Sequence, residues 1–172
     1  MSVTHPVTSL DRRFSSQDAT PVTWHQAEEI LGNGEMFWLA TVRPDGQPHV
    51  TPVAGVWCDG AFYFCTGPSE QKSINLASNP RCTVTIGSPQ FRSGLDIVLE
   101  GQVEPVTDPE RLGSIASSLE HKYDGFFGFS AGNGVLNNAA GGVANLYRIA
   151  PRKALGFGRG QTYSQTRWAF QT

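Results

Sequence analysis

Cysteine and charge are both scarce in this chain of 172 residues. Its three cysteines, Cys58, Cys65 and Cys82, are odd in number and have no Cys-x-x-Cys spacing, which argues against a disulfide framework and a cysteine metal site. Thirteen Lys and Arg residues against fifteen Asp and Glu residues give a net charge of −2. Because nucleic-acid-binding surfaces are strongly basic, we expect no nucleic-acid partner, and any anionic ligand must be held by local geometry.

Long apolar segments are missing as well. No run approaches the roughly 20 apolar residues that a membrane-spanning helix needs. Residues 1–18 lack the apolar stretch of a secretory signal. We therefore expect a cytoplasmic protein that does not associate with membranes.

Familiar catalytic motifs are also missing. The chain has no Gly-x-Ser-x-Gly elbow and no His-Glu-x-x-His metal motif, and its four histidines match no metal-binding spacing. The glycines of residues 156–160 lack the spacing and the βαβ context of a dinucleotide fingerprint. We therefore predict no metal site and no catalytic side chain, a pattern that suits a protein whose cofactor performs the chemistry.

The residues that are present indicate a compact β protein. Hydrophobic residues make up 39% of the chain and charged residues 16%, while 19 glycines and 11 prolines suit many turns between short strands. The length suits one core. We predict an N-terminal arm of residues 1–22, lying over the surface or over a partner subunit, and a single domain of residues 23–172.

Periodicity predicts the elements of this domain. Thr23 and Gln26 form a capping box that starts a helix over residues 24–31, and further helices are expected over residues 70–78 and 109–123. Apolar runs between turn signals predict strands. They cover residues 36–42, 48–57, 61–66, 81–87, 95–106, 143–149 and 153–157, and the Gly- and Asn-rich residues 126–142 are expected to be a loop that orders on assembly. The chain is thus mainly β with two to three helices, arranged as a barrel or a sandwich.

Two features of this pattern point to a ligand. Pro52 lies inside a predicted strand, which indicates a sheet edge, a bulge, or a place where a ligand replaces a neighbouring strand. Thr66-Gly-Pro-Ser69 leads into a helix start near Glu70, where free N–H groups favour an anion and Lys72 adds a positive charge. The alternative is that Ser69 only caps the helix and Lys72 is solvated.

Taken in order, the segments resemble the pyridoxamine 5′-phosphate oxidase-like split β-barrel proteins, and among them the flavin/deazaflavin oxidoreductases of the B type. The resemblance depends on the order and spacing of several short motifs. They are Trp38-Leu-Ala-Thr-Val-Arg-Pro-Asp-Gly46, Pro48-His-Val-Thr-Pro-Val53, Gly60-Ala-Phe-Tyr-Phe-Cys-Thr-Gly67, Gln71-Lys-Ser-Ile-Asn-Leu76, and residues 79–81, 96–101, 147–154, 157–158 and 164–168. Together they cover most of residues 37–107 and 145–170.

The resemblance implies a fold and a cofactor site. The fold is a split β-barrel of the FMN-binding type, a Greek-key barrel of six to seven strands that forms a homodimer with cofactor between the subunits. The backbone of Val50, Thr51, Pro52 and Val53 would face the tricyclic ring of the cofactor. The phosphate would be surrounded by Thr66, Gly67, Gln71, Lys72 and Asn75. The aromatic C-terminal segment with Trp168 would cover the partner's site.

One departure weakens the expected phosphate site. Relatives often carry Arg-Lys at the helix start and a further basic residue two places on, whereas this chain has Gln71-Lys72 and Ile74. The site keeps one cation, so phosphate binding should be weaker unless Arg43, Arg81 or the partner adds charge.

The implied function is that of an oxidoreductase. It would use the reduced deazaflavin coenzyme factor 420, with FMN as the competing cofactor, to transfer hydride to a small organic acceptor. The alternative is a non-catalytic protein that binds or carries a flavin or deazaflavin. Oxidation of pyridoxamine phosphate itself is disfavoured, because the additional phosphate-binding arginines of that enzyme are not found.

Overall fold

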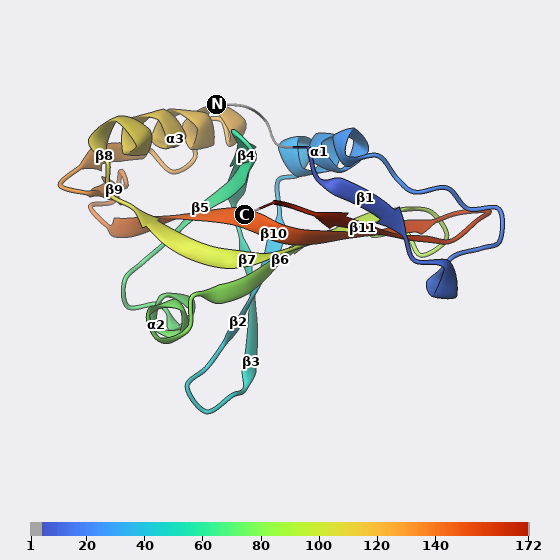
Figure 1. Ribbon diagram of the computed structural model, residues 1–172. Helices are drawn as coiled ribbons and strands as arrows, with labels where there is room; N and C mark the ends of the chain where they lie inside the picture. The colour runs from blue at the N-terminus through green and yellow to red at the C-terminus, as the bar shows by residue number, and fades with distance from the viewer. Residues whose placement is uncertain (1–4, 172) are drawn as a thin grey trace.

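The computed structural model describes residues 5–171, which fold into one open, mainly antiparallel β-sheet with three α-helices against it (Figure 1). The strands are β1 (Val7–Leu10), β2 (Phe37–Val42), β3 (Pro48–Val53), β4 (Gly55–Cys58), β5 (Ala61–Thr66), β6 (Arg81–Ile86), β7 (Gly94–Val106), β8 (Ser130–Gly132), β9 (Val135–Asn137), β10 (Val143–Arg159) and β11 (Ser164–Ala169). The helices are α1 (Trp24–Asn33), α2 (Gln71–Ser78) and α3 (Pro109–Lys122), and a short 3-10 turn η1 covers Arg12–Phe14. In this part of the chain no helix is long and apolar enough to cross a membrane.

The long strand β10 organises the sheet. It pairs with β7 along nearly its whole length, with β5 and β9 through its first half, and with β11 through its second half. The main ladder runs β1-β11-β10-β7-β6-β2-β3, so β1 and β3 are its two edges. A register shift between Pro151 and Lys153 marks a bulge, which bends the strand where a proline cannot donate to the ladder.

The sheet curls round its own core. Phe37 on β2 and Phe62 on β5 have ring centroids 4.6 Å apart, although these two strands do not pair with each other. Phe62, Phe64 and Trp168 belong to one core cluster with α1, whereas Tyr63 faces a second cluster beneath α3. Successive side chains of β5 therefore fill cores on opposite sides, as the alternation of a strand requires.

Local signals placed several elements correctly. Thr23 Oγ1 accepts the Gln26 backbone N–H at 3.3 Å and Gln26 Oε1 accepts that of Thr23 at 3.0 Å, which confirms the capping box of α1. Asp59 and Gly60 both have positive φ, 49° and 70°, as the predicted two-residue hairpin between β4 and β5 demands. The fold is mainly β with three helices, in agreement with the expected two to three helices.

Other predictions were wrong in detail. The strand expected over residues 48–57 is two strands, β3 and β4, with a break at Ala54. The strands expected over 143–149 and 153–157 are one, β10, because the bulge tolerates Pro151. The loop expected over 126–142 contains the hairpin β8–β9, in which Asn133 and Gly134 make the turn at positive φ and Leu136 is fully buried.

The first and the last strand of the chain lie side by side in the sheet. Residues 7–10 of the expected arm form β1, which pairs with β11 in the C-terminal segment, so this part of the arm is an edge strand of the chain's own sheet (Figure 1). Residues 1–4 and 172 lie outside the described residues. The division into an arm of residues 1–22 and a domain of residues 23–172 stays a prediction.

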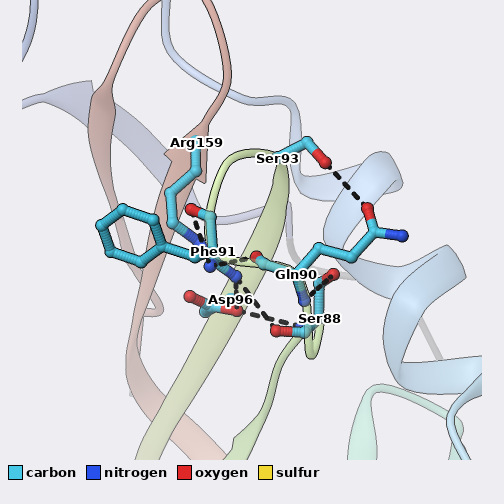
Figure 2. A network of polar contacts seen from close by, with 6 residues as sticks. All are labelled: Ser88, Gln90, Phe91, Ser93, Asp96 and Arg159. Atoms are coloured by element: carbon cyan, nitrogen blue, oxygen red, sulfur yellow. Dashed lines mark hydrogen bonds and ion pairs between the residues drawn. The ribbon is translucent and has the colours of Figure 1, made fainter.

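A network around Arg159 holds the loop between β6 and β7 (Figure 2). The Arg159 guanidinium on β10 donates to the Asp96 carboxylate at 2.7 Å and to the backbone carbonyls of Ser88 and Gln90. Ser88 N–H also donates to Asp96, at 3.0 Å. The loop thus has fixed backbone partners while Phe91 at its tip is 81% exposed.

Close packing of Gly156 on Trp168 predicts the effect of adding one methyl group. A Cβ at Gly156 would lie 2.4 Å from the Trp168 ring, so Gly156→Ala should lower the free energy of unfolding by about 1–3 kcal/mol. Gly113 in α3 has open space around it, so Gly113→Ala should raise the free energy of unfolding by about 0.5–1 kcal/mol. Chemical denaturation of both variants measures this, and equal changes would contradict the described packing.

Candidate functional site

The start of α2 holds an anion of the chain itself. Glu70 is the N-cap residue, and its Oε1 accepts the backbone N–H of Gly67 at 2.8 Å. Its other oxygen, Oε2, forms an ion pair with Lys72 Nζ. Burial acts to raise the Glu70 pKa, but hydrogen bonds from Lys72 and Gly67 outweigh it, so the pKa lies below its usual value. We call Thr66, Gly67, Glu70, Gln71 and Lys72 the α2 cradle.

The cradle overturns the simpler interpretation of this segment. Ser69 is not the N-cap, because that position belongs to Glu70, whose own side chain caps no helix N–H. Lys72 is only 9% exposed and is therefore not a solvated surface lysine. The cradle combines a cation, the backbone N–H donor of Gly67 and a helix start, which is the donor set of an anion site.

A chain of hydrogen bonds joins the cradle to β3. Gln71 Nε2 donates to Asn75 Oδ1 at 2.8 Å, and Asn75 Nδ2 donates to Thr41 Oγ1 at 2.9 Å. Thr41 Oγ1 in turn lies 3.3 Å from the carbonyl oxygen of His49 and 3.5 Å from its Nδ1. Asn75 is completely buried and Thr41 nearly so. The structure thus links the helix start to the strand that sequence reasoning assigned to the ring of the cofactor.

The strand β3 is an edge, as Pro52 indicated. Within the described residues β3 pairs only with β2, with Pro52 opposite Trp38 and Val50 opposite Ala40. The side chain of Val50 is exposed, whereas Val53 packs into the core and can offer a ligand only its backbone. Edge strands carry backbone groups without ladder partners, so this strand can accept a flat ligand alongside it.

A cavity of about 450 Å³ lies at the same corner of the sheet. Its walls come from β2, β3, β6, β7 and β10, and Thr41 belongs both to this wall and to the hydrogen-bond chain from α2. Arg81 and Arg152 line it, and neither forms an ion pair within residues 5–171. The size falls in the range of small-molecule sites, and the two guanidinium groups make this corner electropositive.

Trp168 lies in the core of the described chain. Its side chain is 0% exposed and packs edge-to-face on Trp24, with ring centroids 5.3 Å apart. In the described chain the ring is enclosed by α1 and β10, and the expectation that the C-terminal segment with Trp168 covers a partner's site stays a prediction. The apolar character of the C-terminal segment comes from β11 packing on that core.

Two of the expected site residues carry buried hydroxyls without a hydrogen-bond partner in the described chain, Thr51 on β3 and Thr66 at the end of β5. Buried polar groups are normally paired, and such exceptions require an explanation. The Thr66 hydroxyl lies close enough to the Glu70 carboxylate to help lower its pKa, which places it at the cradle. An anionic ligand with acceptor oxygens fits this donor set.

Sequence reasoning missed two residues of this site, Glu70 and Thr41. Thr41 occupies an inward position of β2 after Phe37 and Leu39, so a polar residue in an apolar row was an available signal. Glu70 gave no such signal, since an acidic residue at a helix start is ordinary. Its role depends on how residues 66–69 turn back toward it.

The structure thus joins an edge strand, through buried polar groups, to a helix start where Gly67 and Lys72 contact a carboxylate. The chain belongs to the pyridoxamine 5′-phosphate oxidase family, whose sequence model matches residues 23–140. The class that the fold and the family together define is that of the pyridoxamine 5′-phosphate oxidase-like proteins.

Individual proteins match over different parts of the chain. Pyridoxine/pyridoxamine 5′-phosphate oxidase of Cupriavidus taiwanensis is 36% identical over 74 residues, which is 42% of this chain and 34% of that enzyme. The match thus spans about a third of the relative's length. A solved structure of an F420 reductase is 26% identical with a TM-score of 0.55, covering 74% of this chain and 94% of that one. An FAD-binding protein from Mesorhizobium loti is 18% identical with a TM-score of 0.60, covering 95% and 98%, and shows the shared fold.

The buried link between α2 and β3 predicts unequal costs of removing its members. Asn75→Ala removes two hydrogen bonds at a fully buried position, so it should lower the free energy of unfolding by about 1–3 kcal/mol. Gln71→Ala removes one bond at a partly exposed position and should cost less than about 1 kcal/mol. Urea unfolding of the two variants measures the difference. An Asn75→Ala cost no larger than that of Gln71→Ala would contradict the role given to Asn75.

Proposed function

We propose that this protein is a cytoplasmic oxidoreductase that binds factor 420, or alternatively FMN, and reduces a small organic acceptor. The observation that carries the proposal is the α2 cradle, which already binds a carboxylate through Gly67 and Lys72 beside an edge strand. The bound cofactor would supply two-electron redox chemistry by giving or taking hydride. The chain's own residues then need only to bind, orient and exclude water.

Each part of the site has a proposed task. Gly67 N–H, Lys72, Gln71 and the Thr66 hydroxyl would hold the phosphate, with Asn75 orienting Gln71 from below. The backbone of residues 50–53 would lie along the ring, where an edge strand can donate and accept hydrogen bonds. Arg81, at the wall of the neighbouring cavity, is a candidate for the additional charge that Gln71 fails to provide.

Factor 420 is preferred over FMN because the F420 reductase is 26% identical and almost its whole chain is covered. The three cysteines lie on separate strands and form no disulfide, which suits a reducing compartment. The substrate is left open to a screen of small acceptors, since the walls of such sites are loops that vary between relatives.

A homodimer is the second part of the proposal. Trp38, Val42 and Val50 are 50%, 37% and 55% exposed and lie on the outer face of the paired strands β2 and β3. Exposed apolar patches of this kind mark interaction surfaces. We propose that a second copy covers this patch, so that β3 of one subunit and residues of the other enclose the ring. The curl that brings Phe37 to Phe62 supports the split barrel of the family as the unit that dimerises.

A non-catalytic binder or carrier is the alternative function. It is favoured by the Glu70 carboxylate inside the cradle and by Gln71 in place of a cation, since both weaken the electrostatic attraction of the cradle for a phosphate. Oxidation of reduced factor 420 across a panel of enones, followed by absorbance, separates the two: turnover supports the enzyme, whereas tight binding without turnover of any acceptor favours the carrier.

Cofactor binding is tested by titrating the purified protein with oxidised factor 420 and with FMN, following quenching of its four tryptophans. We expect micromolar or tighter binding of factor 420. Because Lys72 is the cradle's cation, Lys72→Ala should weaken binding at least tenfold, which is about 1.4 kcal/mol. Arg13→Ala, which removes a cation paired with Asp11 on the N-terminal segment, should change nothing. No binding of either cofactor would contradict the proposal.

Dimerisation is tested by sedimentation velocity. The protein should sediment at twice the 18.6 kDa mass of one chain, and Val50→Lys should shift it to the monomer because a charge would be buried at the patch. Phe91→Lys changes a more exposed apolar side chain off the patch and should leave the dimer intact. A wild-type monomer at micromolar concentration would contradict this part of the proposal.

A further inference from the structure

Glu70 sits where the proposed ligand's phosphate would have to be. One carboxylate oxygen accepts the Gly67 N–H and the other contacts Lys72, so a single side chain of the protein uses both of the cradle's main donors. A Cβ added at Gly67 would be 3.3 Å from Glu70 Oε1, which shows how closely the carboxylate lies over this backbone. The protein therefore carries its own anion at the anion site.

The carboxylate is on the solvent side of the ion pair. The Glu70 side chain is 48% exposed, whereas that of Lys72 is only 11% exposed. The lowered pKa of Glu70 keeps it charged at neutral pH. An incoming phosphate meets a charged carboxylate before it reaches the lysine.

We propose that Glu70 is a specificity-determining residue of this site, an internal anion that a phosphate must displace and that limits the ligand charge the cradle tolerates. The inference rests on the proposed function. Displacement is feasible because the half-exposed glutamate can turn into solvent while the phosphate takes over its contacts with Lys72 and the Gly67 N–H, so the buried lysine keeps a negatively charged partner.

Charge decides which phosphate is favoured. Lys72 contributes one positive charge and Glu70, still attached to the same turn after displacement, one negative charge. Glu70 therefore cancels much of the attraction of Lys72, and its charge repels each negative charge on the ligand. A phosphodiester, as in factor 420, carries one charge at the phosphate, whereas the monoester of FMN carries up to two. The glutamate thus penalises the monoester more than the diester.

The Thr66 hydroxyl is a further feature that supports the cradle as a ligand site. It is buried without a hydrogen-bond partner in the described chain, at the residue directly before Gly67. A phosphate has more acceptor oxygens than a carboxylate, so it can pair with this hydroxyl as well as with Gly67 and Lys72. A phosphate in place of the carboxylate would therefore give the Thr66 hydroxyl a hydrogen-bond acceptor.

The test compares Glu70→Gln with the wild-type protein in the same two titrations, with FMN and with oxidised factor 420. Glutamine is nearly the same size and keeps hydrogen-bonding capacity, but it frees Lys72 and removes the negative charge. We expect Glu70→Gln to tighten FMN binding at least tenfold and factor 420 binding about threefold, so that the preference for factor 420 narrows. Glu104→Gln, which removes an exposed carboxylate paired with Arg148 on β7 and β10, should shift neither affinity.

Further variants make the outcome unambiguous. The gain in affinity for FMN and for factor 420 should vanish in the double variant Glu70→Gln, Lys72→Met, because it depends on the freed lysine. Thermal unfolding of each variant shows that it is folded. If the wild type binds factor 420 and Glu70→Gln changes neither affinity, the role of Glu70 is overturned while the proposed function stands. If Glu70→Gln binds a cofactor and the wild type does not, the role of Glu70 is supported. If neither protein binds either cofactor, both are overturned.

Discussion

The strand β10 is the constraint on which the rest of the structure depends. Its ladders to β5, β7, β9 and β11 bring together segments from both ends and the middle of the chain. Because β5 pairs with its first half, the turn that follows β5 and the start of α2 are placed next to the sheet. β7, along its length, positions β6 and hence the pair β2–β3 at the opposite edge.

The candidate site lies where the start of α2, placed by β5, comes close to the pair β2–β3, placed by β7 and β6. The curl of the sheet returns β2 to the core beside β5, and Asn75 then bridges α2 to Thr41 through buried hydrogen bonds. A buried amide with both ends paired is costly to displace, so the helix start and the edge strand keep a fixed relation. Rigid placement of this kind suits the proposed function, in which the chain's contribution is the orientation of a cofactor.

Sequence reasoning succeeded where the determining interaction is local. The capping box at Thr23 and Gln26 and the hairpin at Asp59-Gly60 are encoded within a few residues, and both were confirmed. Pro52 indicated an edge because proline lacks a donor wherever it stands in a sheet. The family followed from motif order and is shown by the match over residues 23–140.

It failed where the interaction is between segments distant in the chain. The pairing of β1 with β11 joins residues more than a hundred positions apart, and no local pattern in residues 7–10 predicts it. A tryptophan such as Trp168 can belong to a core or cover a ligand, and the sequence does not distinguish the two. In the structure its packing on Gly156 and on Trp24 of α1 places it in the core. The contact of Glu70 with Gly67 depends on the backbone path of four residues, which propensities do not determine.

A crystal structure of the protein grown with factor 420 tests the central claim most directly, because it locates the phosphate and the glutamate together. The account predicts the phosphate on the Gly67 N–H and Lys72, the Glu70 side chain turned into solvent, and the ring along residues 50–53 with a second copy of the chain over it. A ligand bound elsewhere, with the Glu70 carboxylate still seated on Gly67 and Lys72, would contradict it.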